Sequence, residues 1–200
     1  MSSTDADLTV SGRYFFTGRR TGNAPLTTLT RAPDRDEAAE YYFRYIDRVP
    51  AGDIVRTLEE QGNETFAFLE SIPERRSLHR YAPDKWSVRS VVGHLNDCER
   101  LFVFRAFWFA RGFDTELPSF DQNVAVDAAD ADDRAWSDLI NEFRSVRAAT
   151  LTFFRSLPES AWDRRGIASG NPFTVRALAY LAAGHVMHHV SILRERYLLA

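Results

Sequence analysis

The sequence predicts an all-α protein: a four-helix bundle with a long crossover between helices 2 and 3, preceded by an N-terminal extension. Four segments of about 20 residues carry apolar side chains at intervals of three and four, the period of a helix with one buried face. Capping residues or prolines bound these segments. A weak candidate strand lies at residues 8–15, and no other stretch alternates apolar and polar residues, so we expect no sheet.

We divide the chain into an N-terminal extension with a short helix, residues 1–50, and the bundle, residues 51–200. Residues 1–35 are largely polar and are expected to wrap on the surface or to be mobile. A short helix is predicted over residues 34–48, ending near Pro50. It carries four closely spaced aromatic residues, Tyr41, Tyr42, Phe43 and Tyr45.

The first two bundle helices each follow a residue suited to helix capping. Asp53 is expected to cap the first, which runs to about Ser71. Ser87 is expected to cap the second, which runs from Val88 to about Arg111. Because the second helix is apolar around much of its circumference, we expect it to lie at the centre of the bundle.

A connection of about 20 residues, 113–134, separates the second helix from the third, which spans roughly 135–157. The fourth helix is predicted from Val175 to Leu199. A connection that long inside a compact domain is typical of a functional loop or of a crossover between parallel neighbours. We therefore expect helices 2 and 3 to be parallel and the other sequential pairs to be antiparallel.

Three of the five histidines lie within residues 184–189. His185 and His189 are four residues apart, so on a helix their imidazoles lie one turn apart and can converge on one point. His94, on the apolar face of the second helix, is the obvious third donor. Three imidazoles with an open fourth position are typical of a catalytic metal site. A hydrogen-bonded core histidine is the alternative for each of them.

Two acidic residues are candidates for a catalytic base, Asp97 and Asp121. Asp97 and Cys98 share a helix face with His94, so either could also bind the metal; a buried, inert thiol is the alternative for Cys98. Asp121, in the crossover, could reach the opening of the site, or it could cap the loop. Glu99 points elsewhere on the helix and is expected to pair with an arginine such as Arg105 or Arg194.

Composition excludes several classes of function. The net charge of −3 gives no reason to expect nucleic acid as a partner, and no segment is long and apolar enough to span a membrane. One cysteine cannot form an internal disulfide and suits a reducing cytoplasm, where we expect the protein to be located. There is no Gly-rich phosphate loop, nucleophile elbow or Cys-x-x-Cys pair. An exposed apolar face would favour a homodimer.

Four stretches, in order and spacing, resemble the DinB-like superfamily. The resemblance runs from about Asp53 to the C-terminus. The stretches are Tyr81-Ala-Pro-Asp-Lys-Trp-Ser-Val-Arg, Gly93-His-Leu-Asn-Asp-Cys-Glu-Arg, Leu117-Pro-Ser-Phe-Asp-Gln-Asn and His185-Val-Met-His-His-Val-Ser-Ile-Leu.

The resemblance implies a four-helix bundle that binds a divalent metal, most often Zn or Ni with Fe as a further option, through His94, His185 and His189. It also implies a small-molecule substrate. Members of the family include enzymes that use a low-molecular-weight thiol and others described as metal-dependent hydrolases. The family name refers to induction by DNA damage and does not imply DNA binding.

Three functions stay open at this point. The first is a thiol S-transferase, in which Arg105 or Arg194 would hold a carboxylate of the second substrate. The second is a hydrolase that uses metal-activated water, with Asp97 or Asp121 as base. The third is a non-enzymatic stress protein that binds a metal or a small molecule.

Overall fold

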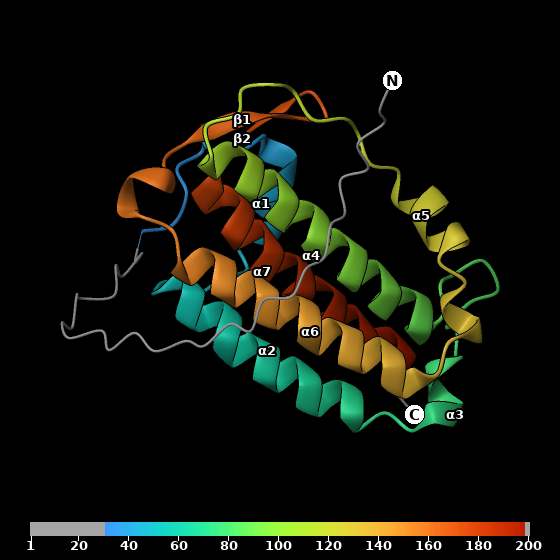
Figure 1. Ribbon diagram of the computed structural model, residues 1–200. Coiled ribbons are helices and arrows are strands. Elements are labelled where there is room, and N and C mark those ends of the chain that lie inside the picture. The colour runs from blue at the N-terminus through green and yellow to red at the C-terminus, as the bar shows by residue number, and fades with distance from the viewer. Residues whose placement is uncertain (1–30, 199–200) are drawn as a thin grey trace, which may run out of the picture.

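The computed structural model describes residues 31–198 and contains the predicted four-helix bundle. Its helices are α2 (Ile54–Glu70), α4 (Val88–Ala110), α6 (Trp136–Arg155) and α7 (Val175–Ile192). α4 and α2 each pack against both α6 and α7. Figure 1 shows α4 and α6 running in one direction and α2 and α7 in the other. The all-α class and the parallel arrangement of the second and third bundle helices are therefore confirmed.

Three of the four bundle helices, α2, α4 and α7, begin where a short polar side chain caps them. Asp53 Oδ1 accepts hydrogen bonds from the backbone N–H of Val55 and of Arg56. Ser87 Oγ accepts from the N–H of Ser90 at 2.9 Å. α4 ends just before Gly112, whose φ of +82° is a left-handed conformation that favours glycine. Short helical segments complete the chain: α3 (Glu74–Ser77), η2 (Glu159–Ala161) and the π-helical turn η3 (Leu193–Tyr197), which continues α7.

The expectation that the chain contains no sheet was wrong at residues 165–174. β1 (Arg165–Ala168) and β2 (Asn171–Thr174) form an antiparallel hairpin. Ser169 and Gly170 form its two-residue turn, and both have positive φ, +54° and +69°, as a type I′ turn requires. The Ser-Gly pair was the missed signal, because four-residue strands are too short to display alternation. The candidate strand at 8–15 lies outside the described residues.

The crossover is more ordered than a loop. It contains α5 (Gln122–Ala128) and the 3₁₀ turn η1 (Ala131–Asp133). Its first part pairs with the hairpin: the Leu117 N–H donates to the Ile167 carbonyl, and the Ser169 N–H donates to the Leu117 carbonyl, each at 3.0 Å. Both contacts bring the crossover and the hairpin to the same end of α4, as Figure 1 shows.

The short aromatic helix α1 (Glu40–Ile46) packs directly on α7. The contact is closest at Gly184, where an added Cβ would lie 2.0 Å from the Tyr45 carbonyl oxygen. Glycine at 184 therefore allows α1 to lie against the helix turn that carries His185. Phe43 and Ile46 are buried in the same core as the bundle helices. The division of the chain at residue 50 stays a prediction.

The predicted partners of Glu99 were wrong. Glu99 is buried and forms a bidentate pair with Arg147 of α6, with N–O distances of 2.7 and 2.8 Å. Nη1 of Arg147 also donates to the Leu58 carbonyl and to Oε1 of Gln61, each at 2.7 Å. Gln61 in turn donates to the Ala183 carbonyl. One arginine therefore links three of the four bundle helices, and Gln61 extends the network to α7.

Candidate metal centre

Three imidazoles converge where α4 crosses α7. His185 lies between the other two: its Nε2 is 3.2 Å from Nε2 of His94 and 3.2 Å from Nε2 of His189. His94 and His185 are buried, and His189 is half-buried. The structure thus brings the three predicted residues together. Their role as metal ligands stays a prediction.

The two nitrogen–nitrogen distances from His185 fit a shared ion. Two imidazole nitrogens bound at ~2.0–2.1 Å to one tetrahedral ion lie ~3.3 Å apart, close to the observed separation. Hydrogen bonds between the imidazoles do not by themselves explain why the three nitrogens lie so close together. A neutral imidazole nitrogen either donates or accepts, so His185 Nε2 cannot donate to one neighbour while it accepts from the other.

Burial keeps the three imidazoles neutral. Desolvation lowers the pKa of His94 from 6.5 to about 4. Desolvation, and then the charges that His94 and His188 would carry, lower the pKa of His189 to about 3. Desolvation likewise lowers the pKa of His185 well below its usual value, with its histidine neighbours adding to the effect. A metal ligand must be unprotonated, so these residues are ready to bind at neutral pH.

Cys98 also belongs to the cluster. Its Sγ lies 3.5 Å from Nδ1 and 3.6 Å from Nε2 of His94, and the donor atoms of His94, Cys98 and His185 all lie within 4.8 Å of one another. Burial, reinforced by the nearby Asp97 carboxylate, raises the pKa of the Cys98 thiol to about 12. Cys98 therefore stays protonated without a metal, and His189 and Cys98 are alternative third donors beside His94 and His185.

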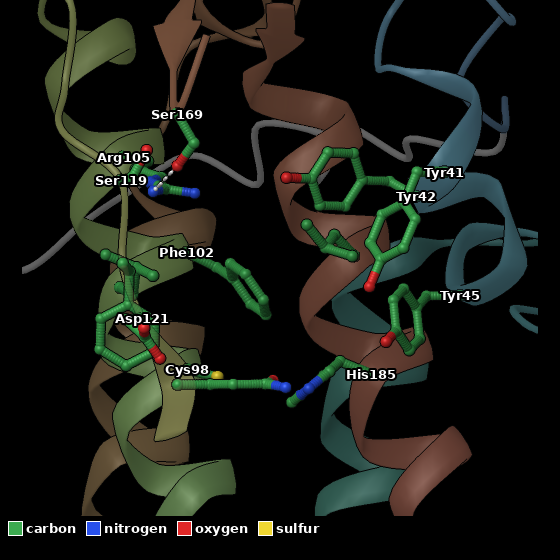
Figure 2. A pocket seen from close by; sticks show the side chains of 14 residues that line it. Tyr41, Tyr42, Tyr45, Cys98, Phe102, Arg105, Ser119, Asp121, Ser169 and His185 are labelled. Atoms are coloured by element: carbon green, nitrogen blue, oxygen red, sulfur yellow. Dashed lines mark hydrogen bonds between the residues drawn. The ribbon is translucent and has the colours of Figure 1, made fainter. Parts of the chain in front are cut away.

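The centre borders a cavity of about 480 Å³, drawn in Figure 2. Cys98 and His185 form its floor. Arg105 and Asp121 lie on one side, and the tyrosines of α1 lie across from them. The sequence interpretation missed this aromatic wall, because it assigned the short helix to the N-terminal extension and named no residue of it as part of the site. The close spacing of Tyr41, Tyr42 and Tyr45 was the available signal.

A second cavity, of about 280 Å³, reaches the centre at His189. Trp86 and Asn123 are among its lining residues. The start of α5 contributes to both cavities, because Asp121 and Gln122 line the larger one and Asn123 lines the smaller. The candidate centre thus has open space next to two of its three histidines.

The two predicted bases occupy different places. Asp121 lines the larger cavity, and its Oδ1 caps α5 by accepting from the Asn123 N–H at 2.9 Å. Asp97 is not among the residues that line either cavity; its carboxylate lies 3.7 Å from Arg100. Burial raises the pKa of Asp97 although Arg100 opposes the shift. Catalytic roles for both residues stay predictions.

The two candidate arginines are also separated. Arg105 lines the larger cavity. Arg194 stacks on the ring of Phe68, 4.7 Å from its centroid, and borders a different hollow between α2 and α7. Of the two, only Arg105 lines the cavity beside the three histidines.

Comparison with known families agrees with this architecture. The family model described as the DinB superfamily matches residues 57–193. The chain belongs to the DinB superfamily. All three histidines of the centre and the larger part of the cavity lie within the matched residues, whereas α1 precedes them.

Two solved structures show the same fold. YfiT from Bacillus subtilis, a probable metal-dependent hydrolase with an unusual four-helix bundle topology, is 18% identical with a TM-score of 0.64; the match covers 82% of this chain and 89% of YfiT. The mycothiol-dependent maleylpyruvate isomerase is 12% identical with a TM-score of 0.59, and the match covers 68% of this chain and 58% of the isomerase. None of the curated proteins compared with the chain matches it.

None of the helices described in residues 31–198 combines the length and the apolar character needed to cross a bilayer.

Acid is expected to destabilise the metal-free protein well above the pH at which carboxylates titrate. The folded pKa values of His94 and His189 lie below 6.5, so the unfolded chain binds more protons and stability falls as pH falls below 6.5. Each histidine then costs about 2 kcal/mol at pH 5. Urea unfolding midpoints at pH 7.5, 6 and 5 with chelator present would measure this. Equal midpoints at the three pH values would contradict this expectation. His189→Gln should reduce the change of the midpoint with pH.

Proposed function

We propose that the protein is a metal-dependent S-transferase that joins a low-molecular-weight thiol to a small electrophile, with the ion held by His94, His185 and His189. The observation that carries the proposal is the convergence of three neutral imidazoles beside two cavities. A divalent ion, with Zn or Ni ahead of Fe, would supply Lewis acidity that lowers the pKa of a thiol or of water at its open position.

Aromatic side chains pack against two of the histidines and orient them. The ring of Phe102 lies edge-on to His185 at a centroid distance of 5.5 Å, and Tyr45 does so at 5.5 Å from the other side. Trp86 lies 4.9 Å from the ring of His94. These contacts restrict the rings of His185 and His94 and create low-polarity surroundings on those sides, in which charge interactions are stronger.

The two cavities favour a reaction with two organic substrates. The larger one meets the centre at His185 and the smaller one at His189, so two molecules could approach from different sides of α5. A thiol transfer needs room for both the thiol and its acceptor. A hydrolase needs room for one organic substrate and a water molecule.

Hydrolysis is the second candidate. The observation that favours it is Asp121, an exposed carboxylate on the wall of the larger cavity, where it could accept a proton from water. YfiT, the similar structure described as a probable metal-dependent hydrolase, adds an analogy of fold. A non-enzymatic protein that binds a metal or a small molecule is the third candidate.

Parallel assays of the metal-loaded protein separate these functions. One assay follows the loss of a free thiol, with cysteine and glutathione as probes, in the presence of activated aryl halides and maleate esters. The other follows release of p-nitrophenol from its esters without any thiol. We expect thiol consumption that needs the metal and disappears in His185→Ala. Ester turnover alone would favour the hydrolase, and inactivity in both assays despite bound metal would favour a binding protein.

We also propose that the protein is a homodimer. An exposed aromatic patch on α4 and the segment that follows it supports this: Phe104 is 47% exposed and Phe113 is 46% exposed. The ring of Trp108 stacks on Phe113 at 4.2 Å and lies 5.9 Å from Phe104, so the three rings adjoin one another. A monomer mass at every concentration in light scattering would remove this proposal.

A further inference from the structure

Arg105 differs from the other buried arginines of the described chain. Arg89, Arg147 and Arg176 are each paired with a glutamate at 2.7–2.9 Å. Arg105 is only 3% exposed, yet within residues 31–198 no carboxylate lies within ion-pair distance of it. A buried guanidinium without a counter-charge is costly, and the cost is removed when an anion binds.

The Arg105 guanidinium is held in place by two hydrogen bonds, and some of its N–H groups have no acceptor in the described part of the chain. Nη2 donates to the Ser169 hydroxyl at 2.8 Å and to the Pro118 carbonyl at 3.2 Å. Nε is buried and has no acceptor in the described part of the chain. Ser169 belongs to the hairpin turn and Pro118 to the crossover, so two segments far apart in sequence orient one side chain. A fixed cation with unused N–H groups is suited to bind a carboxylate.

The wall across the cavity from Arg105 is aromatic. Figure 2 shows Tyr41, Tyr42 and Tyr45 of α1 on the side opposite Arg105 and Ser119, with His185 at the bottom between them. The Tyr42 ring packs edge-on against Phe173 at 4.7 Å, which fixes its position. α1 precedes the residues matched by the family model, so the aromatic wall lies outside the matched segment.

We propose that the larger cavity binds a small aromatic carboxylate, with the carboxylate on Arg105 and the planar body against the tyrosines of α1. The volume of about 480 Å³ is within the range of small-molecule sites. A molecule held this way extends toward His185 and the metal centre. The identification of this ligand as the substrate rests on the proposed function, whereas its binding does not.

Calorimetric titration of wild-type protein with matched ligands tests the proposal directly. Benzoate carries both features, benzamide lacks the charge and acetate lacks the ring. The titrations use chelator-treated protein, so that a carboxylate cannot bind to an ion instead. We expect benzoate to bind roughly tenfold to a hundredfold more tightly than benzamide, the value of charge-assisted hydrogen bonds, and more tightly than acetate. Equal affinity for benzoate and benzamide would overturn the proposal.

Two variants and a control test the roles of Arg105 and Tyr42 in ligand binding. Arg105→Met should abolish the preference for benzoate over benzamide, and Tyr42→Leu should reduce the preference for benzoate over acetate. Arg194→Met removes an arginine that borders a different hollow and should change neither. Unchanged benzoate binding in folded Arg105→Met, checked by circular dichroism, would refute the role of Arg105. If Arg105→Met fails to fold, the wild-type ligand comparison decides.

The same titrations distinguish failure of the carboxylate site from failure of the proposed transferase function. Benzoate binding to a protein that takes up no metal would leave the carboxylate site standing and remove the transferase. Benzoate binding that appears only after Zn is added, and that persists in Arg105→Met, would place the carboxylate on the ion and overturn the inference about Arg105.

Discussion

Replacing His185 by alanine is expected to abolish metal binding. His185 Nε2 lies 3.2 Å from Nε2 of His94 and 3.2 Å from Nε2 of His189, so its loss removes the one nitrogen that contacts both other imidazoles. Wild-type protein should contain about one Zn, Ni or Fe per chain by elemental analysis. Added Zn at a hundredfold excess over its Kd should stabilise the wild type by about 2.7 kcal/mol, which raises Tm by roughly 5–10 °C. His185→Ala should show neither effect.

His188→Ala is the matched control, because His188 lies on the same helix with its ring against Tyr45 and contributes no nitrogen to the cluster of converging imidazoles. It should retain the metal. Wild-type protein that neither contains a metal nor takes up added Zn or Ni would remove both enzymatic functions and leave the three histidines as core residues.

Two further variants decide the third donor. His189→Ala and Cys98→Ala remove the alternative partners of His94 and His185. If the three histidines hold the ion, His189→Ala should lose it and Cys98→Ala should keep it. The opposite pattern would assign the thiol as ligand and would favour a softer metal.

Breaking the buried pair of Glu99 and Arg147 is expected to have the largest effect on stability. Arg147→Met leaves the Glu99 carboxylate buried without its partner and removes the bonds to the Leu58 carbonyl and Gln61. Removing one member of such a pair costs about 3–5 kcal/mol. That is a large fraction of the roughly 5–15 kcal/mol by which domains are stable. Urea unfolding followed by circular dichroism measures the change.

Arg144→Met is the control for this measurement. Arg144 lies one turn earlier on α6 and pairs with Glu70 at 2.6 Å, but both side chains are at least half exposed. Exposed pairs contribute about 0–1 kcal/mol, so Arg144→Met should shift the unfolding midpoint little. Comparable losses in the two variants would show that burial of the Glu99 pair is not what makes it important. The double variant Glu99→Leu/Arg147→Met should recover part of the loss, because no charge is then left buried alone.

Local chemistry explains why the helices could be predicted so closely. A cap such as Asp53 or Ser87 acts on N–H groups two or three residues away, so the beginning of a helix is encoded within one turn. The hairpin at 165–174 escaped prediction although its signal is also local. Its strands are too short for a period to emerge, and the conformation of Ser169 becomes evident only in the folded turn.

By itself the sequence determined the bundle, its crossover and the three histidines that could share one site. The reason is that helical spacing places His185 and His189 on one face of their helix. His94 lies on the apolar face of its own helix, which packs toward the core. Tertiary structure alone decided which charges meet, because Glu99 and Arg147 are 48 residues apart and their partnership depends on how α4 packs on α6. It also decided that α1, the crossover and the hairpin together enclose the cavity at Arg105, since no local pattern records contacts among segments so distant along the chain.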